Sequence, residues 1–276
     1  MKKKYNNYGK AMAATIILAV AFSVFPILGN AQENEPQAFV LVDCLKIPFE
    51  NEAKYLDFVK NTVVPLQKER IKQGSIVVWY LYKVRFTGAG DNYNYVAVTL
   101  FDKPANIESP FRGLDVGKIL PGKDLNKVLL EANSMRTLVS STLLQRQSFV
   151  YPQSGPGDFK YLQIDYMKVQ QGKEGEYFDV ENTVWKPIHN EFVKAGSRVG
   201  WSLWGRVFPT GSGLDFQYLT VNYFDDWSKI GTADYNDAFG KAHPGKDMNE
   251  LGEKTNASRT LVKSELWEVV ERAFPQ

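Results

Sequence analysis

Apolar and polar side chains alternate along residues 39–47, a pattern that indicates a β-strand whose two faces meet different surroundings. The same alternation returns in residues 161–169, which lie 122 positions further along the chain (161 − 39). A predicted helix follows each strand, at residues 50–73 and 173–195, and each helix ends at a Gly-Ser pair, where glycine suits the left-handed position after a helix. One proline stands inside each helix, so we expect both helices to be kinked or divided.

Each half of the chain continues in the same order. A strand containing Trp79 or Trp201 comes next, and a glycine-containing turn joins it to a further strand at residues 93–101 or 216–224. The spacing of these two strands predicts a β-hairpin in both halves.

The strongest repeat is a Pro-Gly-Lys-Asp turn at residues 121–124, which recurs at residues 244–247, 123 positions later (244 − 121). A short predicted helix follows each turn, and an Arg-Thr-Leu-Val sequence then begins the last strand of each half, at residues 136–139 and 259–262. These matches at constant spacing indicate that the chain contains two copies of one unit. Each copy has the order β-α-β-β-α-β, which is the ferredoxin-like order.

This element order, the length of the unit and its duplication resemble the dimeric α+β barrel superfamily. The resemblance covers essentially the whole chain after residue 31, and it implies an α+β fold in which two tandem ferredoxin-like repeats pack sheet to sheet as a pseudo-twofold barrel. We therefore predict a first repeat at residues 32–150, a linker at 151–158 and a second repeat at 159–276. The alternative is two separate ferredoxin-like domains, each covered by another chain.

The first 31 residues differ in composition from the rest. Basic residues precede an almost uninterrupted apolar run at residues 11–25, and small residues at positions 29 and 31 suit a cleavage site. We therefore predict a signal peptide at residues 1–31 and an exported protein, either periplasmic or secreted. An uncleaved membrane anchor is the alternative, because the apolar run approaches the roughly 20 residues that span a bilayer. After residue 31 we predict no membrane association.

Removing the signal peptide changes the charge balance. It carries four lysines and no acidic residue, which leaves 29 basic residues (33 − 4) against 31 acidic ones. Because the apparent basic excess belongs to the signal peptide, we predict no nucleic-acid partner. A single cysteine, Cys44, excludes a disulfide framework within the chain, and its place in an apolar strand predicts a buried thiol. These patterns do not determine the oligomeric state.

The strand alternation places Asp43 and Asp165 opposite an apolar row of side chains in each half. If the apolar rows meet the helices, the two aspartates point into the barrel. Asp165 would then share one pocket with polar and aromatic residues of neighbouring strands, namely Trp204, Tyr218, Thr220 and Asn222. A partly apolar pocket with hydrogen-bonding groups is typical of a small-ligand site. The alternative is a structural role, with hydrogen bonds from Arg136 and Arg259 to the aspartates.

Both histidines of the chain, His189 and His243, fall in the second half. Trp185 and Trp204 also lie there, and neither has a tryptophan counterpart in the first half. These residues bias the predicted binding site toward the second repeat. The tryptophans suit stacking on a planar ligand, although filling a barrel core is the commoner role of such side chains. We predict no metal site.

Three functions are consistent with these patterns. The first is the binding of a small aromatic or carbonyl-type ligand in a barrel pocket. The second, implied by the resemblance, is a cofactor-independent oxygenase, cyclase or isomerase, with Asp165 or His189 as the acid/base. The substrate would then be positioned by Tyr218, Asn222 or Trp204.

The third function is haem binding. Haem-binding members of the superfamily use a helix histidine as axial ligand, and His189 is the residue of this chain that the resemblance points to. No cofactor is otherwise predicted, and the sequence does not decide whether the protein is an enzyme.

Overall fold

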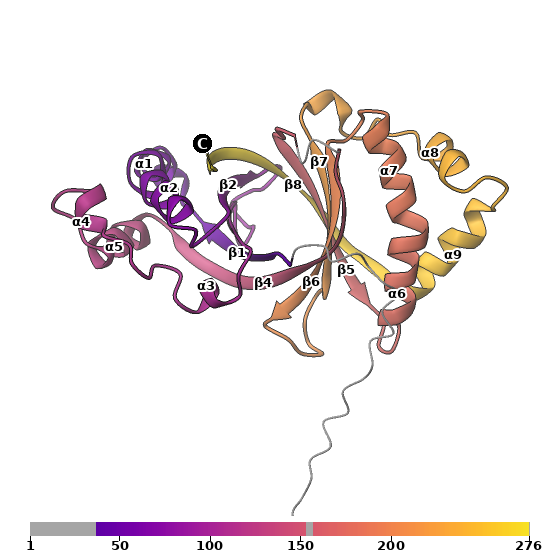
Figure 1. Cartoon of the computed structure of the whole chain (residues 1–276), viewed down its shortest axis with the longest axis horizontal. Coiled ribbons are helices and arrows are strands. Elements are labelled where there is room, and N and C mark those ends of the chain that lie inside the picture. The colour runs from indigo at the N-terminus through magenta and orange to yellow at the C-terminus, as the bar shows by residue number, and fades with distance from the viewer. Residues whose placement is uncertain (1–36, 153–156, 276) are drawn as a thin grey trace, which may run out of the picture. The chain divides into compact units, whose positions relative to one another are not determined.

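Eight antiparallel strands close into a barrel in the computed structural model, which describes residues 37–152 and 157–275 (Figure 1). The predicted signal peptide lies outside the described residues, as does part of the predicted linker. Among the described residues, no helix combines the length and apolar character that a membrane crossing requires.

Each strand is hydrogen-bonded to two neighbours, so the sheet has no end. In barrel order the strands are β1 (Phe39–Lys46), β3 (Tyr95–Phe101), β2 (Val78–Val84), β8 (Arg259–Ala273), β5 (Tyr161–Val169), β7 (Tyr218–Phe224), β6 (Gly200–Phe208) and β4 (Thr137–Val150).

The two longest strands join the halves of the chain. The first part of β4 pairs with β1, and its last part pairs with β6 of the second half. In the same way β8 pairs with β5 along its first part and with β2 of the first half along its last part. Because these pairings build one closed sheet, the chain forms an α+β barrel and not two separate domains.

Helices pack outside the barrel, on the side of their own half (Figure 1). The helices of the first half are α1 (Glu52–Phe58), α2 (Val64–Lys72), α3 (Ala105–Glu108), α4 (Val116–Ile119) and α5 (Leu125–Met135). The helices of the second half are α6 (Glu174–Val180), α7 (Lys186–Lys194), α8 (Tyr235–Ala242) and α9 (Met248–Ser258). Short 3₁₀ turns cover Phe49–Asn51 and Trp227–Lys229.

The predicted division of the long helices at proline is confirmed. A π-helical turn separates α1 from α2 at Val59–Val63, and another separates α6 from α7 at Glu181–Trp185. Pro65 and Pro187 stand in the first turn of α2 and α7. Proline lacks the N–H that an interior helical position donates, so the helix widens by one residue before it and starts again.

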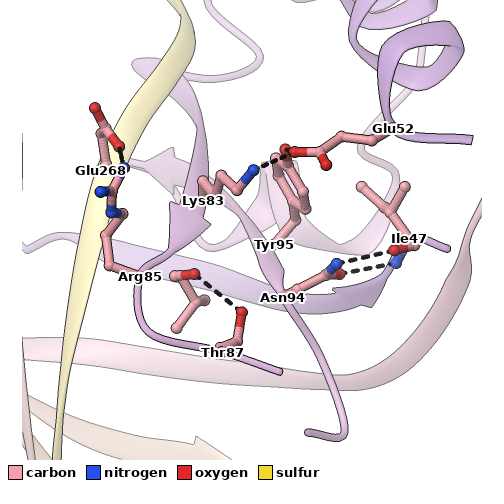
Figure 2. Close-up of polar contacts among 9 residues, drawn as sticks. Ile47, Glu52, Lys83, Arg85, Thr87, Asn94, Tyr95 and Glu268 are labelled. Atoms are coloured by element: carbon pink, nitrogen blue, oxygen red, sulfur yellow. Dashed lines mark hydrogen bonds and ion pairs between the residues drawn. The ribbon is translucent and has the colours of Figure 1, made fainter. Parts of the chain in front are cut away.

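Polar contacts fasten the first helix and the hairpin to the barrel (Figure 2). The Glu52 carboxylate accepts hydrogen bonds from Lys83 on β2 and from the Tyr95 hydroxyl on β3. The hydrogen bonds from Lys83 and Tyr95 keep the pKa of Glu52 below its usual value. Nearby, the Asn94 side chain forms hydrogen bonds of 2.9 and 2.8 Å with the backbone of Ile47.

The apolar rows of the strands face the barrel interior. Val40 and Val42 of β1 pack there against Leu162 and Ile164 of β5, in a core cluster formed by strands and the segments beside them. The expectation that the aspartates point into the barrel is therefore wrong. The more apolar row lines the barrel interior, and the aspartates lie on the outer face, where other polar side chains bind them.

Candidate functional site

A cavity of about 520 Å³ occupies the end of the barrel at which β2 and β5 begin. All eight strands of the described residues contribute to its walls, six of them with valine, leucine or isoleucine, and β6 and β8 with Trp204 and Trp267. Both halves of the chain contribute to it. The cavity therefore lacks the bias toward the second half that we predicted. Trp204, one of the predicted site residues, lies on its wall.

Seven aromatic rings on the wall of this cavity follow one another in a series, which we call the aromatic belt. Each ring centroid lies 5.1–5.7 Å from the next along the series Trp267, Tyr82, Tyr80, Phe159, Tyr223, Tyr151 and Phe149. The Arg146 guanidinium lies 4.3 Å from the centroid of the last ring. Rings at such spacing prefer offset or edge-to-face contacts, which a flat ligand can extend.

Hydroxyl groups give the apolar cavity a small polar side. The fully buried Ser202 lies between the Tyr223 hydroxyl, 2.9 Å away, and Nε1 of Trp204, which donates to it across 2.7 Å. Burial raises the pKa of Tyr80 and of Tyr151. Both phenols therefore stay protonated at neutral pH and can donate a hydrogen bond to a ligand oxygen.

A cluster of hydrogen-bond donors surrounds one carboxylate, that of Glu265, in the barrel beyond the cavity. Oε1 of Glu265 accepts hydrogen bonds from Tyr93 at 2.6 Å and Lys263 at 2.7 Å. Oε2 accepts from Tyr166 at 2.8 Å and from Nε1 of Trp267 at 2.9 Å. Burial alone would raise the pKa of Glu265, but the hydrogen bonds from Lys263, Tyr93 and Trp267 hold it below its usual value. Trp267 is thus both a wall of the cavity and a member of this cluster, which was not anticipated from the sequence.

The other predicted site residues lie outside the barrel, between its wall and the helices of the second half. Nδ2 of Asn222 is 3.4 Å from Oδ2 of Asp165, whose carboxylate also accepts hydrogen bonds from Ser264 at 2.5 Å and Gln163 at 3.0 Å. Thr220 is opposite Asp165 in the register of β5 and β7. Asp165 is therefore surrounded by the donors expected of a structural carboxylate.

Arg198 connects this group to His189. Its Nη1 lies 2.5 Å from Nδ1 of His189 and donates to Oδ1 of Asn222 across 2.7 Å, while its Nη2 donates to the Tyr235 hydroxyl across 2.7 Å. Arg198 is 3 % exposed and was missed in the sequence. A signal existed: the equivalent position of the first half is Ile76, 122 residues earlier (198 − 76), so an arginine replaces a buried apolar residue.

The aromatic candidates of the second half have separate contacts. Trp185 donates from Nε1 to Thr255 on α9 across 3.1 Å. Tyr218 packs against Tyr177, with 4.9 Å between the ring centroids. The His189 ring stacks on Trp201 at 4.7 Å. The structure therefore brings Asp165, Asn222 and His189 into one network, but it places Trp204 on the opposite side of the barrel wall.

His189 does not fit the role of an axial haem ligand in this arrangement. A guanidinium can only donate hydrogen bonds, so Nδ1 of His189 accepts from Arg198. Burial, together with the positive charge of Arg198, lowers the pKa of His189 well below its usual value, so the ring is neutral and its single proton is on Nε2. A protonated Nε2 has no free electron pair for iron.

Glu181 is a buried acid that was not anticipated from the sequence. It lies in the π-helical turn between α6 and α7, is 2 % exposed, and corresponds to the apolar Val59 of the first half. Burial raises its pKa to about 7, although the positive charge of Arg259 acts in the opposite direction. A charged residue at a position that is apolar in the other half is the sequence signal that could have identified it.

Comparison with known proteins supports the architecture and no particular family. No protein-family model matches the chain, and neither does any curated protein. A monooxygenase-like protein from Fusobacterium nucleatum matches with a TM-score of 0.55 and 9% identity, over 86% of this chain and 94% of that one. A monooxygenase-like protein from Lactobacillus acidophilus matches with a TM-score of 0.51 and 8% identity, over 87% and 97%.

These neighbours have the dimeric α+β barrel fold, so the prediction of that fold is confirmed. A haem-binding protein from Thermus thermophilus also matches, with 12% identity over 85% of this chain and 91% of that one. Its TM-score of 0.45 is too low to support an argument about this chain. The protein is thus an α+β barrel of the dimeric α+β barrel type, and the identities of 8–9% to the two monooxygenase-like structures limit the likeness to the fold.

Proposed function

We propose that the protein binds a flat, mainly apolar small molecule, with an aromatic ring system and a carbonyl or hydroxyl oxygen, inside the barrel. The observation that carries this proposal is the cavity of about 520 Å³ lined by a series of neighbouring aromatic rings. Ligand pockets typically enclose about 300–1,000 Å³ and combine apolar walls with a few polar groups. The barrel cavity has both properties.

The polar side of the cavity supports an oxygen-bearing ligand. The Tyr80 and Tyr151 phenols are hydrogen-bond donors at neutral pH, and the Tyr223 hydroxyl, which also lines the cavity, can serve as donor or acceptor. A ligand carbonyl would accept one of these hydrogen bonds, while its rings would lie against the aromatic belt.

We also propose that the barrel arose from duplication of one ferredoxin-like unit, and that the chain is exported after removal of residues 1–31. The repeated turn at residues 121–124 and 244–247 supports the duplication. The basic and then apolar composition of the first 31 residues supports export.

Filling the cavity is expected to abolish ligand binding. Val221 lies on the cavity wall, and Val221→Trp would place a large ring in the space that a ligand needs. With 2-acetylnaphthalene as the probe, we expect the dissociation constant from isothermal titration calorimetry to rise by roughly tenfold or more. Val139→Trp, on an exposed part of β4, is the matched control and should bind as the unchanged protein does.

Two results would count against the proposal. One is equal affinity of the two variants, with thermal unfolding showing both to be folded. The other is the absence of binding by the unchanged protein to any of a series of naphthyl ketones and alcohols. Ile164→Phe is a milder substitution at the same cavity and tests the same point if Val221→Trp does not fold.

A cofactor-independent oxygenase, cyclase or isomerase is the second candidate. It is supported by the fold shared with the monooxygenase-like structures and by the network that joins Asp165, Asn222 and His189. If the chain converts a ligand, Asp165→Asn tests the acid/base role of that carboxylate. Turnover that survives this substitution undiminished would exclude the role.

Haem binding through His189 is expected to fail. Because the proton of the neutral imidazole is on Nε2, haemin added to the protein should give no Soret band that depends on His189. His189→Gln is the matched variant, since glutamine is the residue at the equivalent position 67 of the first half. Superimposable absorption spectra are expected, and a band that is present only with His189 would contradict the assigned tautomer.

A further inference from the structure

A second cavity, of about 220 Å³, lies in the first half between the outer face of the barrel and helices α1, α2 and α5. The strands β1, β2 and β3 separate it from the barrel cavity. Most of its lining is apolar, including Phe58, Leu66, Trp79 and Val128. The rest of the lining is mainly polar, and its charged residues are two arginines and one aspartate.

Two arginines face this cavity with unused hydrogen-bond donors. Arg70 of α2 is 3 % exposed, and its Nη1 donates to Oε1 of Gln67 across 2.7 Å. Among the described residues no acceptor bonds to its Nε, nor to Nη1 of Arg136, although both atoms are buried. Burial lowers the pKa of Arg70 to about 10, so the side chain remains charged at neutral pH. A buried charged donor without an acceptor is costly, so an acceptor placed in this cavity would relieve that cost at both arginines. Nε atoms of Arg198, Arg206 and Arg259 are unpaired in the same way elsewhere in the described part of the chain.

One carboxylate accompanies the two arginines. Asp43 lines the same cavity and accepts a hydrogen bond from Ser141 across 2.6 Å. Burial is the largest influence on Asp43 and raises its pKa, while the hydrogen bond from Ser141 and the positive charge of Arg136 act in the opposite direction. Even with Asp43 ionised, the cavity keeps one uncompensated positive charge.

In the second half, the two terminal nitrogens of Arg198 have acceptors, although its Nε has none among the described residues. Arg198 bonds there to His189, Asn222 and Tyr235. The first half has Gln67 at the position equivalent to His189, and Arg70 at the position equivalent to Phe192. The histidine that accepts from Arg198 in the second half is therefore a glutamine in the first half. There Gln67 bonds to Arg70 beside the cavity, and Nε of Arg70 and Nη1 of Arg136 keep no acceptor among the described residues.

We infer that this cavity binds a small monocarboxylate with an aromatic or branched apolar tail. A carboxylate presents two acceptor oxygens in a plane, which suits guanidinium donors and supplies the missing negative charge. A cavity of about 150 Å³ is known to hold benzene, so a volume of about 220 Å³ is enough for one ring with a carboxylate. This site is separate from the barrel cavity and does not rest on the function proposed for it.

Benzoate and its neutral analogue benzamide are the probes that test the inference. The protein is expected to bind benzoate at least about tenfold more tightly than benzamide in isothermal titration calorimetry, since a charge-assisted hydrogen bond is the stronger one. Arg70→Gln keeps a polar side chain but removes the charge, and should weaken benzoate binding by about tenfold or more while leaving benzamide nearly unchanged. Arg272→Gln removes an arginine from an exposed ion pair with Asp158 and should change neither.

Ala97→Leu is a second variant that fills part of the cavity without changing its charge. It should weaken benzoate and benzamide alike, while binding of 2-acetylnaphthalene to the barrel cavity stays unchanged. The inference is overturned if benzoate fails to bind, if benzamide binds as tightly as benzoate, or if the Arg70→Gln protein is folded and binds benzoate with full affinity. None of these outcomes bears on the barrel cavity.

Discussion

Replacing Trp201 by alanine is expected to lower the free energy of unfolding by about 3–5 kcal/mol, as is usual for a tryptophan deleted from a core. Trp201 is fully buried on the outer face of β6 and stacks on His189 with 4.7 Å between the ring centroids. Its removal would leave a cavity at the place where α7 meets the barrel. Urea denaturation followed by circular dichroism measures the change.

Trp227→Ala is the control for this prediction, because Trp227 is 45 % exposed. Its ring packs on Tyr161 at the surface, so the loss should stay below about 1 kcal/mol. Equal losses in the two variants would show that α7 is not anchored to the barrel through Trp201.

Glu181→Gln is expected to stabilise the protein above neutral pH by about 3 kcal/mol and to have little effect near pH 4. Burial raises the pKa of Glu181 to about 7 in the folded chain, whereas the unfolded value is 4.5. Between these values the folded state binds more protons than the unfolded state, so the stability due to this group falls as the pH rises. Each unit of pKa difference corresponds to about 1.4 kcal/mol.

The measurement is the difference in unfolding free energy between the variant and the unchanged protein, followed from pH 4 to pH 8. That difference isolates Glu181 from the other titrating groups, among them Glu52 and Glu265, whose lowered pKa values act in the opposite sense. Glu253→Gln, at an exposed position of α9, should show no such pH dependence. A pH-independent difference for Glu181→Gln would mean that the folded chain holds this carboxyl in its ordinary ionised form.

The two cavities lie on opposite faces of the same strand. Val40 and Val42 of β1 line the barrel cavity, while Leu41 and Asp43 line the cavity beneath α1, α2 and α5. Successive side chains of a strand point to opposite faces, so one short segment contributes to both. A barrel of this kind can therefore offer an aromatic interior and a charged exterior cleft without additional elements.

Local patterns in the sequence were sufficient for the order of the elements. The alternation of residues 39–47 and 161–169 predicted β1 and β5, and the prolines at 65 and 187 predicted the division of the long helices. Both are local consequences of backbone geometry: side chains of a strand repeat every two residues, and proline removes a helical donor. Arg198 and Glu181 could also have been found, because each replaces an apolar residue of the other half.

Only the tertiary structure decided which face of each strand is the interior. A period of two separates two rows of side chains but does not say which row a closed barrel encloses, so Asp43 and Asp165 were assigned to the wrong side. The cavities are even harder to predict from the sequence than the interior face of a strand. Their volume depends on how side chains from strands far apart in the chain fill a shared space, as Tyr80 and Tyr223 do, and no local pattern encodes that sum of volumes.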